Sequence, residues 1–121
     1  MATAVEYKHQ GYNCAEAMVK ACNDLHDMRI PSELASPFGG GMACGDTCGA
    51  VVGALMALGA ARGRTDSAQK NGTRAPAAQL MKQLEEKYGS LDCRDLKRNR
   101  VSCDAIIEDA YAALEELLRR E

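Results

Sequence analysis

Six cysteines in a chain of 121 residues are the side chains best suited to chemistry. Four of them follow a residue type that commonly caps a helix, in the pairs Asn13-Cys14, Thr47-Cys48, Ser90 with Cys93, and Ser102-Cys103. A thiol in the first turn of a helix faces unpaired N–H groups and the positive end of the helix dipole, which both favour the thiolate. We therefore expect four helix N-termini to converge on one negatively charged group.

The type of site follows from the donors. A set of four thiolates suits an iron–sulfur cluster, and tetrahedral thiolates also suit zinc. No two cysteines have the C-x-x-C spacing, so the usual zinc-ribbon, thioredoxin and covalent haem signatures are absent. Cys22 falls in the middle of an expected helix and Cys44 in a glycine-rich segment without a capping partner, so we expect neither to be a ligand.

A simpler interpretation of the cysteines stays open, because free cysteine often fills a core as a small hydrophobic residue. Two other functions would use the same four residues. A thiol–disulfide redox protein would need no metal, and a structural zinc domain would need no redox change.

The elements that must position these thiols are helices. Residues 34–61 contain one charge, Asp46, and residues 48–61 have no polar face, which predicts a buried central helix rich in glycine and alanine. Gly39-Gly40-Gly41 ahead of it predicts a hinge. Apolar residues at three- and four-residue steps predict four principal helices over residues 14–25, 48–62, 76–88 and 103–118.

Shorter helical turns are expected at residues 5–10, at 33–36 and around Cys93. With few aromatic and β-branched residues, the composition favours closely packed helices over a sheet. We therefore predict an all-α fold, a small bundle of four principal helices plus short turns around the central helix, in a single domain of residues 1–121.

Composition excludes several classes of function. A formal net charge of −2 and a pI near 5.7 argue against nucleic acid as a partner. The central apolar run is shorter than the roughly 20 residues that a membrane span needs. Residues 1–10 lack the apolar segment of an export signal, so the expected compartment is the cytoplasm. No nucleophile–base pair or carboxylate pair indicates an enzyme, and an electron-transfer role would require a redox partner protein.

One basic segment leaves two interpretations open. Between Cys93 and Cys103 the chain contains four cationic residues: Arg94, Lys97, Arg98 and Arg100. Such a run is most often a solvated surface, but it could also flank an anionic cluster or bind an acidic partner.

Several short motifs resemble one known family. They are Gly11-Tyr12-Asn13-Cys14-Ala15, Gly39-Gly40-Gly41-Met42, Cys48-Gly49-Ala50-Val51-Val52-Gly53, Cys93-Arg94-Asp95-Leu96 and Cys103. In this order, between about Gly11 and Leu118, they resemble the redox-active C_GCAxxG_C_C proteins.

The resemblance implies a small helical domain in which Cys14, Cys48, Cys93 and Cys103 hold an iron–sulfur cluster. It also implies similarity to the non-haem, iron–sulfur part of split-Soret cytochromes, although this chain lacks the haem-attachment motif. Cys22 and Cys44 have no counterpart in the family pattern.

Overall fold

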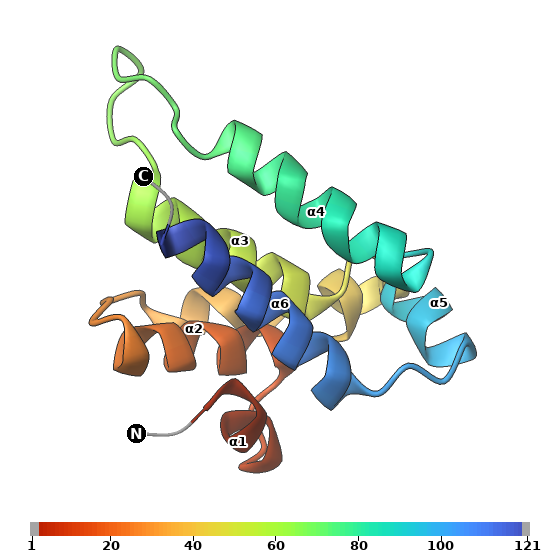
Figure 1. Cartoon of the computed structure of the whole chain (residues 1–121). Helices are drawn as coiled ribbons and strands as arrows, with labels where there is room; N and C mark the ends of the chain where they lie inside the picture. Colours follow the sequence, from red (N-terminus) through yellow and green to blue (C-terminus); the bar gives the residue numbers. More distant parts are fainter. Residues whose placement is uncertain (1–2, 120–121) are drawn as a thin grey trace.

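A computed structural model describes residues 3–119, which form helices and connecting turns. The α-helices are α1 (Ala4–His9), α2 (Cys14–Leu25), α3 (Gly49–Arg62), α4 (Arg74–Tyr88), α5 (Cys93–Arg98) and α6 (Cys103–Arg119). Within residues 3–119 there is no β-strand, and the one extended pairing is an isolated bridge between Thr47 and Asp92. The predicted all-α bundle is confirmed (Figure 1).

The central helix is α3, as the sequence predicted. It packs against α2 and α6, and α4 lies along α6 on the other side of the bundle (Figure 1). Its first ten residues are largely buried, because α2 and α6 cover opposite sides of it. Its last turn, from Gly59 to Ala61, is exposed, so the expectation of complete burial was wrong there.

A close crossing of α2 and α3 depends on one glycine. A Cβ atom added to Gly53 would lie 2.7 Å from the Met18 Cβ atom and 3.0 Å from the Ala15 carbonyl oxygen. These distances leave no room for a side chain, so the backbones approach as closely as the small-residue pattern predicted.

Two tight turns connect α2 to α3. The first, η1 (Ser32–Phe38), is a 3₁₀ helix that extends the short helix expected at residues 33–36. The second, η2 (Gly41–Gly45), follows Gly40 and is left-handed over several residues: φ is 68° at Gly40, 70° at Gly41, 58° at Met42 and 64° at Ala43. The glycines permit this conformation without cost, but Met42 and Ala43 adopt it against their steric preference.

The hydrophobic core lies between α2, α3 and α6. Its fully buried side chains include Met18, Val51, Leu58, Ile107 and Leu114. Over the described residues, no helix is both long and apolar enough to cross a membrane.

Two glycines of α3 give a matched test of the close crossing. Gly53→Ala should lower the free energy of unfolding by about 1–3 kcal/mol, because its Cβ would overlap Met18 and Ala15. Gly59→Ala, with no atom within 4 Å of its Cβ, should raise it by about 0.5 kcal/mol through helix propensity. Urea unfolding followed by circular dichroism measures both. Equal effects of the two substitutions would contradict the close packing.

Candidate functional site

Each of the four predicted thiols lies at the start of a helix. Cys14, Cys93 and Cys103 are the first residues of α2, α5 and α6. Cys48 differs from the prediction, because it is the N-cap of α3 and the helix begins at Gly49. The structure thus places four sulfur atoms at four helix N-termini, one of them a residue earlier than expected.

Two of the expected caps are present. Asn13 accepts a hydrogen bond from the Glu16 N–H at 2.8 Å, and the Glu16 carboxylate accepts one from the Asn13 N–H at 2.9 Å, which completes a capping box. The Asn13 N–H, together with the Ser36 hydroxyl, holds the pKa of Glu16 below its usual range. At the start of α6, the Ser102 hydroxyl accepts a hydrogen bond from the Ala105 N–H at 3.4 Å.

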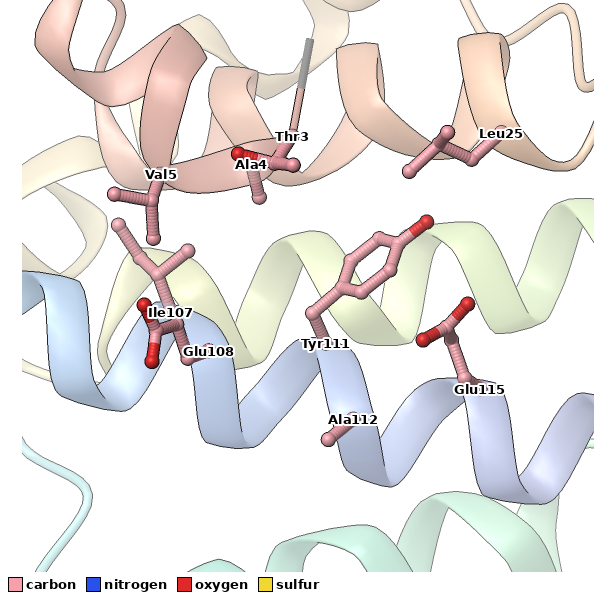
Figure 2. Close-up of a pocket in the computed structure, with 9 residues that line it drawn as sticks. All are labelled: Thr3, Ala4, Val5, Leu25, Ile107, Glu108, Tyr111, Ala112 and Glu115. Atoms are coloured by element: carbon pink, nitrogen blue, oxygen red, sulfur yellow. The ribbon is translucent and has the colours of Figure 1, made fainter.

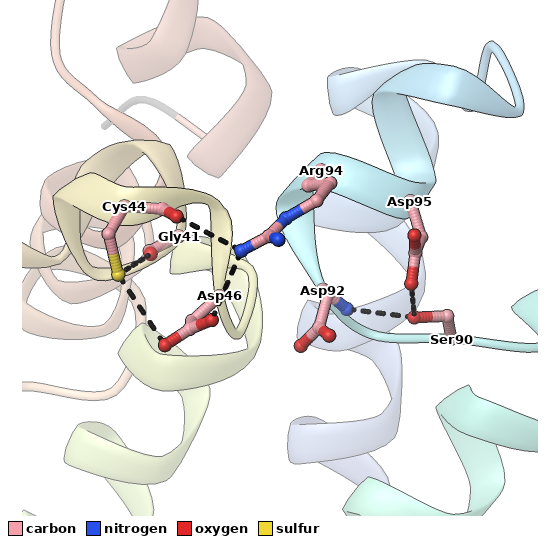
Figure 3. A network of polar contacts seen from close by, with 7 residues as sticks. All are labelled: Gly41, Cys44, Asp46, Ser90, Asp92, Arg94 and Asp95. Carbon is pink, nitrogen blue, oxygen red and sulfur yellow. Dashed lines mark hydrogen bonds and ion pairs between the residues drawn. The ribbon is translucent and has the colours of Figure 1, made fainter.

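The other two expected caps were wrong. Thr47 does not cap α3, because its backbone pairs with Asp92 in the extended bridge. Ser90 does not cap α5: its hydroxyl accepts a hydrogen bond from the Asp92 N–H at 3.2 Å and donates one to Asp95 at 2.8 Å (Figure 3). Asp92 occupies the N-cap position instead, without a side-chain capping bond.

This extended bridge joins the starts of α3 and α5. The Cys48 N–H donates to the Leu91 carbonyl oxygen at 2.8 Å, and the Cys93 N–H donates to the Asp46 carbonyl oxygen at 2.6 Å. Two of the four cysteines are therefore fixed next to each other by their own backbone hydrogen bonds.

Cys14 lies beside two of the other thiols. Burial, first, and then the neighbouring sulfur atoms of Cys48 and Cys103 together raise the pKa of the Cys14 thiol to about 12. At the backbone level, a Cβ atom added to Gly49 would lie 3.2 Å from the Cys14 Cβ atom, so the starts of α2 and α3 are in contact.

Cys48 is the most central of the four thiols. Burial raises the pKa of the Cys48 thiol, the N–H groups of Ala50 and Val51 lower it, and the neighbouring Cys93 and Cys103 raise it again. Although the sulfur makes no full capping hydrogen bond, these two N–H groups face it and favour the thiolate. Through Cys48, the structure brings all four predicted residues into one neighbourhood.

Tyr88 is a neighbour of this group that the sequence did not indicate. Its hydroxyl donates a hydrogen bond to Asp109, which also pairs with Lys87 at 2.7 Å. Burial, the Asp109 carboxylate and the Cys48 sulfur together raise the pKa of Tyr88 to about 12. The tyrosine therefore borders Cys48 on the side of α4.

The remaining two cysteines do not lie at a helix N-terminus. Cys22 is fully buried in the middle of α2, where burial and then Glu115 raise the pKa of its thiol to about 12. Cys44 is exposed in η2, with its sulfur 3.4 Å from an Asp46 carboxylate oxygen and 3.8 Å from the Gly41 carbonyl oxygen (Figure 3). Neither occupies a helix start, as the sequence predicted.

The donor chemistry fits a metal–thiolate group. A metal that binds here must displace the thiol protons, so the raised pKa values of Cys14 and Cys48 predict that binding strengthens as the pH rises. Among residues 3–119, however, no three His, Cys, Asp or Glu side chains already have an arrangement that could hold a metal ion. The four thiols are therefore neighbours that do not form a metal site in this conformation.

A groove elsewhere on the molecule contains no cysteine. It encloses about 370 Å³ between α1, the end of α2 and α6, and Tyr111 extends across it toward Leu25 (Figure 2). Its lining residues are Thr3, Ala4, Val5, Leu25, Ile107, Glu108, Tyr111, Ala112 and Glu115. None of the four candidate cysteine ligands therefore lines this groove.

Comparison with known proteins identifies the family. A family model described as "Putative redox-active protein (C_GCAxxG_C_C)" matches residues 12–117, a range that includes all six cysteines. No curated protein and no solved structure matches the chain. The chain belongs to the C_GCAxxG_C_C family.

Two left-handed glycines test how tightly η2 packs against Cys93. A Cβ atom at Gly41 would lie 2.3 Å from the Asp46 carbonyl oxygen and 2.6 Å from the Cys93 Cβ atom, whereas one at Gly40 would meet nothing within 4 Å. Both substitutions to alanine incur the same left-handed cost of about 1–2 kcal/mol. Gly41→Ala should destabilise the protein by a further 1–3 kcal/mol or so, measured by urea unfolding. Similar losses for both variants would show that η2 does not pack against α5.

Alkylation rates test the environments of the thiols. In reduced, chelator-treated protein at about pH 8, iodoacetamide should modify the exposed Cys44 and Cys103 first. Cys14, Cys22 and Cys48 should react last, because a raised pKa keeps each thiol protonated at that pH. Peptide mass spectrometry over time gives the order, and protein unfolded in guanidinium is the control in which these differences disappear. Rapid modification of Cys48 in the folded protein would contradict its burial.

Proposed function

We propose that this member of the C_GCAxxG_C_C family holds an iron–sulfur cluster, or a related metal–thiolate group, through Cys14, Cys48, Cys93 and Cys103. Its role would be electron transfer or redox sensing, which agrees with the redox activity in the family description. One observation supports this proposal above all: four helix N-termini bring one thiol each into the same neighbourhood.

The protein's own groups suit such a cofactor. When bound, a cluster of this type supplies reversible one-electron chemistry, with a potential set by hydrogen bonds to sulfur and by solvent exposure. The Ala50 and Val51 N–H groups would stabilise negative charge on the Cys48 sulfur. Cys48 is 5% exposed, which keeps water from most of that side of the site, while Cys103 lies at the surface.

A metal-free thiol–disulfide protein is a second candidate. Its support is that the Cys14 and Cys103 side chains are neighbours, because a pair of adjacent thiols can be oxidised to a disulfide. A structural zinc domain would use the same four thiolates. The free thiols of the first candidate and the zinc-bound thiolates of the second both require a compartment that keeps cysteines reduced. We propose the cytoplasm.

Composition of the anaerobically purified protein distinguishes the three functions. A coloured protein that contains iron and acid-labile sulfide supports the cluster. A colourless protein without metal supports the dithiol, and stoichiometric zinc supports the structural domain.

Serine substitutions test which cysteines bind the metal. Cys14→Ser, Cys48→Ser, Cys93→Ser and Cys103→Ser should each remove most of the bound metal, because serine keeps the size of the side chain but is a poor soft ligand. Cys22→Ser and Cys44→Ser are the matched controls and should keep it. Metal analysis with far-UV circular dichroism separates lost coordination from lost folding. Full metal occupancy in Cys48→Ser and Cys103→Ser would refute the shared site.

A further inference from the structure

A basic surface lies between Cys93 and Cys103. We define the α5 face as residues 41–46 together with residues 92–102, that is η2, α5 and the turn that leads to α6. These two segments contact each other, and the Arg94 side chain extends from α5 to η2 (Figure 3). Because Cys93 lies within the second segment and Cys103 directly follows it, anything that binds this face approaches two of the four thiols.

The charges of the α5 face are only partly compensated within the molecule. Arg94 pairs with Asp46 at 3.6 Å, and Arg98 pairs with Asp95 at 3.8 Å. The side chains of Lys97 and Arg100 are exposed and have no ion-pair or hydrogen-bond partner among the described residues. The Asp92 side chain is the one carboxylate of the α5 face that is likewise exposed and without an ion-pair or hydrogen-bond partner among the described residues. A net positive surface thus remains on a chain whose net charge is −2.

Backbone strain is concentrated on the same face. Four described non-glycine residues have positive φ, and three of them, Met42, Ala43 and Arg100, belong to the α5 face. Such strain persists only where the surrounding structure enforces it, and it is typical of functional sites. On this strained segment, the Met42 side chain is 44% exposed.

We propose that the α5 face binds an acidic surface of a protein partner. Lys97 and Arg100 would pair with its carboxylates, and Met42 would supply an adaptable apolar contact. Nucleic acid fits less well, since the chain is acidic overall and residues 41–46 and 92–102 contain no aromatic side chain on which a base could stack. That the partner exchanges electrons rests on the proposed function, whereas the binding itself does not.

A short polyglutamate peptide is a suitable probe of this surface. Titrated into the ¹⁵N-labelled full chain at low ionic strength, it should shift the amide signals of residues 41–46 and 92–104. Lys97→Glu with Arg100→Glu should weaken the peptide's affinity about tenfold, and added salt should weaken the binding to the unsubstituted chain in the same way.

The matched control reverses two charges at the other end of α4. Lys70→Glu with Arg74→Glu changes the net charge by the same amount, at exposed residues beyond the α5 face, and should leave the affinity unchanged. Equal losses in both double variants, or shifted signals centred on residues 62–74, would overturn the proposal. So would tighter binding of a single-stranded oligonucleotide than of the peptide.

The same titration on chelator-treated protein keeps the two proposals distinguishable. Peptide binding by a protein that never contains metal would end the cluster proposal and support the α5 face. A cluster-containing protein that does not bind the peptide would support the cluster proposal and end the proposal for the α5 face.

Discussion

The close crossing of α2 and α3 is the contact on which the rest of the structure depends. Without a side chain at Gly53, the α3 backbone reaches Ala15 and Met18, and Gly49 lies against the first turn of α2. This approach places Cys14 beside Cys48. A side chain at either glycine would separate the two helices and, with them, the two thiols. The core of small residues is therefore also what positions the candidate site.

Much of the fold could be predicted from the sequence, because the signals are local. Asn13 and Glu16 form a capping box in any chain where an apolar helix follows, and the prediction of α2 was confirmed at both ends. The strong periodicity of α6 likewise depends only on its own residues. The exposure of the last turn of α3 was not predictable in this way, since it depends on how far α2 and α6 extend along it.

The helix-start positions of the four thiols were predictable, whereas the contacts between these helix starts were not. The position of a cysteine after a capping residue identified four thiols that the structure brings together. The roles of Thr47 and Ser90 were mistaken, because pairing between residues 46–48 and 91–93 joins segments distant in sequence. That pairing draws the Thr47 backbone into an extended conformation and leaves Asp92 at the start of α5. No local pattern encodes such a contact. The left-handed turn at Met42 and Ala43 was also not predicted, because only the adjacent glycines indicate it.

The bridge between Thr47 and Asp92 has a consequence for any electron exchange at this site. The Cys48 and Cys93 amides are held by hydrogen bonds of 2.8 Å and 2.6 Å across it, so the spacing of these residues is set by main chain and not by flexible side chains. Groups held in this way move little when the charge between them changes. Under the proposed function, the main chain around Cys48 and Cys93 would therefore contribute little to the energy needed to rearrange the surroundings during a change of oxidation state.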